Sequence, residues 1–277
     1  EGRHSRHTLD MAFVSPIPQV ADAVGYAPDH PARAKLLRSR AHLAFHLDED
    51  SLAHLQNALG MVAGIVVDEE IRLLYSIAHE YRRRDQYDLA VANFDRALSL
   101  DPEPLLRGLC LLGLGETQFD RGEDGRAYTA EATQIFADVK PGLVARCDIV
   151  LGRGLSTDPA TLDEATAALL RGIELATVEG WHTLGAQAQV DLGEIAIAKA
   201  DFAAADSHYA ESIRVFKERG SNRWVEATVV WAGRLLDQNR RDDASRLMGP
   251  ILRRYMHELQ PKIVAQAREI EARLGPE

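Results

Sequence analysis

Apolar and polar residues alternate along most of the chain with the period of an amphipathic α-helix. Between residues 69 and 100, apolar or small residues recur three or four positions apart in two runs, and a short polar segment at 84–86 separates the runs. This spacing places the apolar residues of each run on one face of a helix. The sequence therefore predicts two helices, at about 69–84 and 86–100, folded back on each other.

Small and aromatic side chains indicate how these two helices pack. Small residues let two backbones approach closely, and aromatic rings fill the wedge that remains between them. Beyond the second helix, Asp101 can accept hydrogen bonds as an N-cap residue and Pro102 suits the first position of a helix, so a third helix is expected to begin there. The small residues are Ala78, Ala90 and Ala97, and the aromatic residues are Tyr81, Tyr87 and Phe94.

The same hairpin pattern recurs along the chain at intervals of 37 to 41 residues. The second helix of each hairpin carries a small residue near its start, and the first helix carries an apolar residue followed by a small one. The intervals between equivalent residues lengthen along the chain in the same way for both positions. The chain is therefore predicted to consist of repeated helical hairpins. The alanines of the second helices are Ala53, Ala90, Ala127, Ala165, Ala205 and Ala244, and the first-helix pairs are Ile77-Ala78, Leu114-Gly115, Leu151-Gly152, Leu192-Gly193 and Trp231-Ala232.

The two ends of the chain differ from the repeats. Residues 1–30 are expected to be a remnant of an expression tag followed by a flexible segment, because prolines and a glycine interrupt any helical period there; that the chain was cut from a longer protein is the alternative. Residues 31–277 are predicted to form a single repeat domain. Its last segment, 261–274, is apolar on one face and polar on the other, as a helix that covers the open end of a solenoid must be.

The hairpin at residues 70–104 resembles a tetratricopeptide repeat. The resemblance covers about residues 34–260; it is also strong for the hairpins that contain Ala205 and Ala244, and it is weak elsewhere. One position departs, because Asp85 stands at the inter-helix turn where the family often has glycine. The long repeats are similar to those of tetratricopeptide domains in bacterial regulators. The resemblance implies an all-α fold, a right-handed superhelical solenoid of about six antiparallel helical hairpins plus a C-terminal capping helix. The positions that agree are Ile77, Ala78, Tyr81, Tyr87, Ala90, Phe94, Ala97 and Pro102.

Charge and apolar run lengths restrict the partners that this solenoid can have. The net charge of −10 disfavours direct nucleic-acid binding. The longest apolar run, residues 61–67, is far shorter than the roughly 20 residues that span a bilayer. No secretory signal is visible. The sequence therefore predicts a cytoplasmic protein without membrane insertion.

The chain offers little for a metal, a cofactor or catalysis. Cys110 and Cys147 stand one repeat apart, so we expect about 10 Å between them, which is too far for a disulfide. Neither has a second cysteine or histidine at ligand spacing, and both are expected to be buried, reduced thiols. His79-Glu80 lacks the second histidine of a zinc-protease helix. No metal, no cofactor and no enzyme activity are predicted.

The resemblance also implies where a partner binds, since the first helices of tetratricopeptide hairpins line the concave surface. In the N-terminal half these positions are basic and aromatic, although the protein is acidic. Histidine stands at two of them where chaperone-binding members carry the asparagine of a carboxylate clamp, so no such clamp is expected. The predicted partner-binding residues are Lys35, Arg38, His42, Arg72, Tyr75, His79, Arg82, Arg83, Phe119 and Arg153.

These positions predict a non-catalytic scaffold or adaptor that binds a protein or peptide in its groove. A basic wall suits an acidic segment of the partner, and self-association is left open. The alternative is a peptide-sensing regulatory domain of a bacterial signalling or transcriptional regulator. A charged, solvated face that binds nothing is the third interpretation.

Overall fold

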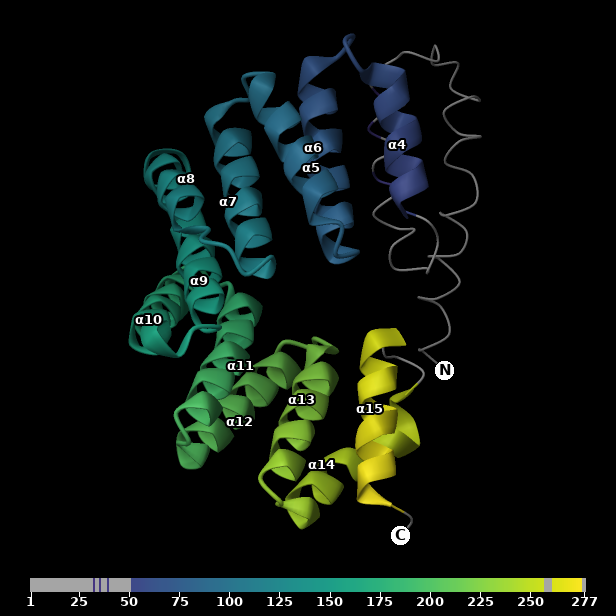
Figure 1. Cartoon of the computed structure of the whole chain (residues 1–277), viewed down its shortest axis with the longest axis vertical. Coiled ribbons are helices and arrows are strands. Elements are labelled where there is room, and N and C mark those ends of the chain that lie inside the picture. Colours follow the sequence, from purple (N-terminus) through teal and green to yellow (C-terminus); the bar gives the residue numbers. More distant parts are fainter. Residues whose placement is uncertain (1–31, 33–34, 36–38, 40–50, 257–260, 276–277) are drawn as a thin grey trace. The chain divides into compact units, whose positions relative to one another are not determined.

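The structure is a computed structural model that describes residues 32, 35, 39, 51–256 and 261–275. Every regular element in these residues is a helix, and they contain no strand (Figure 1). The chain divides into two compact units between Val139 and Lys140. The predicted tag remnant and flexible segment at 1–30 lie outside the described residues.

The first unit is a series of helices in which each packs on the next. Helices α5 and α6 form one antiparallel hairpin and α7 and α8 the next, while α4 packs on α5. The helices are α4 (Ser51–Val62), α5 (Val67–Arg83), α6 (Tyr87–Ser99), α7 (Pro104–Asp120) and α8 (Arg126–Val139).

The second unit continues the same arrangement with three hairpins, α9 with α10, α11 with α12, and α13 with α14. The last helix, α15, packs on α13 and α14 with Ala267 and Ile270 buried, so it covers the final apolar edge as predicted. The elements are η1 (Pro141–Leu143), α9 (Val144–Leu155), η2 (Pro159–Thr161), α10 (Leu162–Val178), α11 (His182–Ala198), α12 (Phe202–Glu218), α13 (Arg223–Asp237), α14 (Arg241–Arg254) and α15 (Pro261–Leu274).

This architecture confirms the all-α fold of consecutive antiparallel hairpins with a C-terminal capping helix. Five hairpins are described in full, and α4 supplies the second helix of the predicted first one. Most residues of the helix expected before α4 lie outside the described part of the chain. The assignment of residues 31–277 to a single domain stays a prediction.

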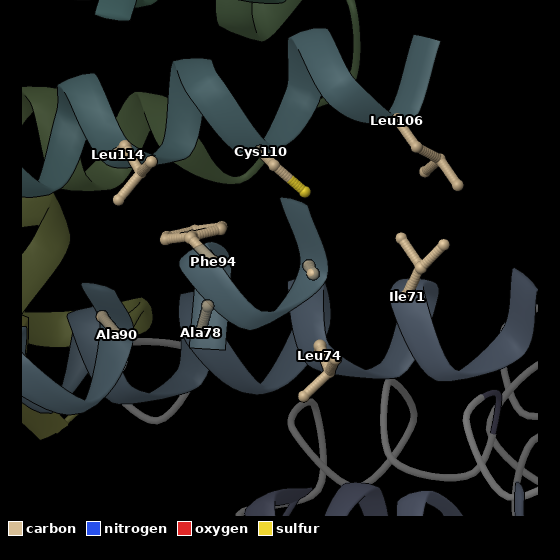
Figure 2. Close-up of a cluster of buried hydrophobic side chains, with 9 residues drawn as sticks. Ile71, Leu74, Ala78, Ala90, Phe94, Leu106, Cys110 and Leu114 are labelled. Carbon is tan, nitrogen blue, oxygen red and sulfur yellow. The ribbon is translucent and has the colours of Figure 1, made fainter. Parts of the chain in front are cut away.

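Phe94 is the centre of the core that joins α5, α6 and α7. Its side chain is fully buried, and in Figure 2 the ring lies between the side chains of Ala78 and Leu114. A Cβ atom at Gly113 would lie 2.4 Å from the ring. The aromatic residue and the glycine therefore depend on each other, because only a residue without a side chain leaves room for the ring.

The small residues of the first helices occupy the helix contacts that the repeat pattern predicted. Ala78 and Ala232 are fully buried. A Cβ atom at Gly115 would lie 2.6 Å from the hydroxyl oxygen of Thr129, and one at Gly193 would lie 3.0 Å from the ring of Tyr209. The two helices of these hairpins can approach only because these positions lack side chains.

The predicted register of the second helices is correct in four repeats and wrong in two. Ala90, Ala165, Ala205 and Ala244 are buried, whereas Ala53 and Ala127 are exposed. In α8 the fourth helical residue is Thr129, which is buried and donates a hydrogen bond to the carbonyl oxygen of Gly125 at 3.0 Å. The loop before α8 is longer than in the preceding hairpin, and a fixed interval of 37 residues misses this shift.

The turns before and after α6 each contain an aspartate with a positive φ angle. Asp85 has φ +56°, so it adopts at the inter-helix turn the left-handed conformation for which the family often uses glycine. The predicted start of the next helix at Asp101-Pro102 is wrong. Asp101 has φ +53° and closes α6, and α7 begins two residues later with Pro104 at its first position.

Both cysteines are free and buried, which agrees with the sequence prediction. Burial raises the pKa of the Cys110 thiol to about 12. Because the thiolate is the reactive form, we expect a chromogenic thiol reagent at about pH 8 to modify native Cys110 far more slowly than the unfolded chain. In denaturant without reductant, both thiols should titrate; finding none would show a disulfide or a bound metal.

Candidate functional site

The candidate site in the first unit is one face of α5, which we call the first-helix face and define by Arg72, Tyr75, His79 and Arg82. Their spacing places these side chains along one side of the helix, away from the buried Leu74. Each is only partly buried. The structure therefore brings four of the five predicted residues of α5 together on one surface.

Aromatic rings form the middle of the first-helix face. The ring centroids of Tyr75 and His79 are 4.5 Å apart with an edge-to-face geometry. Both rings also contact Phe94, at centroid distances of 6.0 Å and 5.3 Å. Since Phe94 is fixed in the core, it holds the two partly exposed rings in place, and they can serve as a preformed platform for an apolar side chain.

The arginines of the first-helix face contact carboxylates of the following repeat. Arg72 Nη2 lies 3.2 Å from Glu103 Oε1, just before α7. Arg82 Nη1 lies 2.9 Å from Glu116 Oε2 and 3.3 Å from Asp120 Oδ2, both on α7. The wall that the sequence indicated as basic therefore carries paired charges. The attraction for an acidic partner is weaker than the row of arginines alone suggests.

Arg83 and Phe119 belong less clearly to a binding surface. Arg83 is exposed at the end of α5 and lies 3.3 Å from Glu80 Oε2 on its own helix. Phe119 is half-buried, and a Cβ atom at Gly125 would lie 2.9 Å from its ring. Phe119 therefore packs inside its own hairpin, which gives it a structural role independent of any ligand.

The remaining predicted residues belong to other segments than α5 or lie outside the described residues. Lys35 is exposed, and its Nζ lies 3.9 Å from Glu69 Oε1. Arg38 and His42 lie outside the described residues. Arg153 belongs to the second unit, where its Nη2 lies 3.0 Å from Asp191 Oδ2 on α11. Burial raises the pKa of Asp191, and the neighbouring Arg153 opposes that rise.

The second unit carries a similar set of ion pairs between its first helices. Arg234 on α13 reaches back to Glu194 on α11 with two contacts, Nε to Oε1 at 3.0 Å and Nη2 to Oε2 at 2.5 Å. Tyr209 on α12 donates its hydroxyl hydrogen to the same carboxylate. The hydrogen bonds that Arg234 itself donates to Glu194 raise the pKa of Arg234. Burial raises the pKa of Tyr209, with the Glu194 charge a further cause.

These carboxylates are the functional neighbours that residue-by-residue reasoning missed. Glu116 and Glu194 were visible at first-helix positions, but nothing in the sequence showed that an arginine one repeat away would contact them. The recurring spacing gives a signal in hindsight, since Arg153 and Asp191 are separated by 38 residues and Arg234 and Glu194 by 40. That spacing is one repeat.

The first-helix face and the ion pairs of the second unit consist of rings and charged groups. Within the described part of the chain, no group of three or more His, Cys, Asp or Glu side chains could hold a metal ion. Among the same residues, every helix is too short or too polar to cross a bilayer. The groups that converge on the first-helix face are aromatic rings, guanidinium groups and carboxylates, which orient a bound chain through packing and hydrogen bonds.

Comparison with known proteins supports the repeat assignment. Residues 71–104 match the tetratricopeptide repeat family model. A crystal structure of a Rap protein complexed with competence and sporulation factor superposes with a TM-score of 0.68 at 14% identity, covering 96% of this chain and 85% of that one. The apo form of RapI gives a TM-score of 0.69 at 12% identity, covering 96% and 94%. No curated protein sequence matches the chain significantly.

The structure and these matches define the class as a helical repeat solenoid. Residues 71–104, which include most of α5, all of α6 and the turn that follows, match the tetratricopeptide repeat, and the other hairpins of the described chain have the same antiparallel arrangement. The TM-scores to the two Rap structures show a shared fold, and at such low sequence identities they show the fold alone.

Proposed function

We propose that this protein is a non-catalytic scaffold or adaptor that binds a protein or peptide on the first-helix face. The observation that carries the proposal is the pair of partly exposed rings, Tyr75 and His79, which Phe94 holds in place between Arg72 and Arg82. Rings fixed before binding lose little conformational entropy when a partner packs against them. Lys35, Arg83 and Phe119 complete the proposed contact set in the first unit, and Arg38 and His42 complete it by sequence. Arg153 belongs to the second unit and stays a separate prediction.

A second candidate function is a peptide-sensing regulatory domain, which would act in the cytoplasm. It is supported by the fold likeness to a Rap protein complexed with competence and sporulation factor. The two functions differ in what binding does to the repeat protein. A sensor changes the geometry of its repeats when the peptide binds, and small-angle X-ray scattering with and without peptide would show a change in radius of gyration. A scaffold keeps its dimensions.

Reversing the charge of Arg72 tests the proposed face. Peptides selected from a displayed library against the whole protein should bind the Arg72→Glu variant about tenfold or more weakly, because the new carboxylate repels Glu103 and removes a donor beside the rings. The loss of one exposed ion pair should change stability by less than about 1 kcal/mol. Helical circular dichroism should therefore stay unchanged.

Arg107 supplies the matched control. It is also on a first helix, and its Nη2 lies 3.3 Å from Glu131 Oε1 in a similarly exposed pair, but the pair is made with the second helix of its own hairpin. Arg107→Glu should bind the selected peptides as well as the unchanged protein does. Equal losses in both variants, or no loss in Arg72→Glu, would place the binding site on another surface.

A further inference from the structure

A separate groove of about 840 Å³ lies in the second unit, among α12, α13 and α14. Two of the three tryptophans of the chain line it, Trp224 and Trp231, together with Tyr255. We call this the aromatic groove. All three aromatic residues are only partly buried. Neither the predicted partner-binding residues nor the ion pairs of the first helices belong to it, so the proposed function leaves it unexplained.

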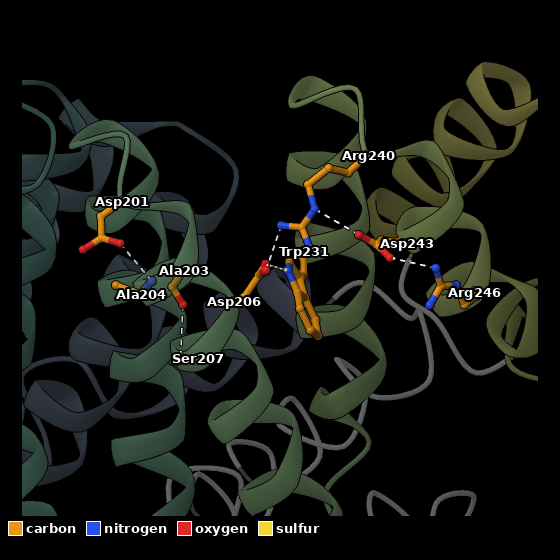
Figure 3. A network of polar contacts seen from close by, with 9 residues as sticks. All are labelled: Asp201, Ala203, Ala204, Asp206, Ser207, Trp231, Arg240, Asp243 and Arg246. Carbon is orange, nitrogen blue, oxygen red and sulfur yellow. Dashed lines mark hydrogen bonds and ion pairs between the residues drawn. The ribbon is translucent and has the colours of Figure 1, made fainter.

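Hydrogen bonds hold one side of the aromatic groove rigidly (Figure 3). Trp231 Nε1 on α13 donates to Asp206 Oδ1 on α12 at 3.0 Å. Arg240, at the start of α14, donates to the other oxygen of Asp206 at 2.7 Å and to Asp243 Oδ2 at 3.0 Å. The network ends at Arg246, whose Nη2 lies 3.1 Å from Asp243 Oδ1. Three helices are therefore tied together beneath the groove, and Trp231 is fixed before any ligand arrives.

The other aromatic residues are also held in defined positions. Trp224 and Tyr255 contact edge to face, with ring centroids 4.9 Å apart. Lys217 places its Nζ 4.6 Å from the centroid of the Trp224 ring. Trp231 stacks on Tyr209 with centroids 5.9 Å apart and ring planes 12° from parallel. A groove whose rings are already oriented offers an apolar site that needs little rearrangement.

The charges that line the aromatic groove have one sign. Arg214, Lys217, Arg246 and Arg254 line it, and no aspartate or glutamate does. Arg214 is paired with Glu211 and Glu218, and Arg246 with Asp243. Among the described residues, no ion pair is formed by Lys217 or Arg254, which both are exposed. Two cations therefore remain available in a protein whose net charge is −10.

We propose that the aromatic groove is a docking site for an acidic peptide segment of a partner protein, distinct from the first-helix face. An apolar side chain of the segment packs on Trp224 and Trp231, and flanking carboxylates pair with Lys217 and Arg254. The one-sided charge explains why the segment is acidic, and the fixed rings explain how it gains apolar contact. The acidic segment of the partner therefore binds at a locally positive groove, although the net charge of this protein is negative.

The test uses the whole protein and a short fluorescein-labelled peptide of glutamate and aspartate around one phenylalanine. Fluorescence anisotropy should show binding that weakens as salt rises from about 0.05 to 0.5 M, since ionic screening shortens the range of the attraction. The double variant Lys217→Glu/Arg254→Glu should bind this peptide at least about tenfold more weakly. A control peptide with lysine in place of every acidic residue should not bind.

A matched double variant tests whether binding depends on the cations of the aromatic groove or only on the net charge of the protein. Arg219→Glu/Arg253→Glu makes the same charge change on the same segments, with exposed residues that do not line the aromatic groove. It should keep binding within about threefold. Equal losses in the two double variants, no binding by the unchanged protein, or tighter binding of oligothymidylate than of the acidic peptide would each overturn the proposal.

Discussion

Replacing Phe94 with alanine should lower the free energy of unfolding by about 3–5 kcal/mol, because a large buried side chain is removed. The side chain is fully buried and joins three helices, α5, α6 and α7. Its removal leaves a cavity lined in part by Gly113, which has no side chain to fill the space. Urea-induced unfolding followed by circular dichroism measures the change.

The same substitution at an exposed phenylalanine supplies the control. Phe202 at the start of α12 keeps 44% of its surface exposed, so Phe202→Ala should change stability by less than about 0.5 kcal/mol. Phe94→Ala should in addition weaken peptide binding at the first-helix face, because Tyr75 and His79 lose the ring that fixes them. An unfolding midpoint of Phe94→Ala equal to that of Phe202→Ala would contradict this view of the core.

Adding one methyl group at Gly125 should lower stability by about 1–3 kcal/mol. A Cβ atom there would lie 2.3 Å from the carbonyl oxygen of Gly115, a backbone atom that cannot rotate away. The clash can be relieved only if α7 and the start of α8 move apart. Thermal unfolding of Gly125→Ala should therefore show a lower midpoint than that of the unchanged protein.

The same replacement of glycine with alanine should have the opposite effect on stability at Gly60. It lies inside α4, and nothing lies within 4 Å of the position that its Cβ atom would take. Because alanine favours the helix, Gly60→Ala should raise stability by about 0.5–1 kcal/mol. If Gly125→Ala raised the midpoint as Gly60→Ala does, the close approach of Gly125 to the Gly115 carbonyl oxygen would not limit stability.

The sequence was sufficient to predict the hairpins because two different positions of the repeat recurred together. The small residues at 78, 115, 152, 193 and 232 are buried as expected, and the capping helix spans the predicted segment, 261–274. Such positions are determined by local spacing and volume. Either property can be recognised from one chain without knowing which helices meet.

Features that depend on loop geometry or on contacts between repeats could not be predicted in this way. The buried position near the start of α8 is occupied by Thr129 and not by Ala127, because the loop before α8 is longer than the loop before α6. The carboxylate partners of Arg72 and Arg82 come from the next repeat, and their distance depends on how closely two hairpins pack. The aromatic groove combines side chains of two consecutive hairpins, so no single repeat contains its pattern.

The ion pairs between first helices of the second unit make its hairpins non-interchangeable. Helix α11 receives Arg153 from α9 through Asp191 and Arg234 from α13 through Glu194, so its acidic residues serve neighbours on both sides. Deleting the α11–α12 hairpin and closing the gap would bring two arginine-bearing helices together without a carboxylate between them. We expect a hairpin that is duplicated, removed or moved within this unit to lose these ion pairs, because each first helix carries the charge that matches its present neighbour. The ion pairs on the polar faces of the hairpins therefore depend on the order in which the hairpins follow one another along the chain.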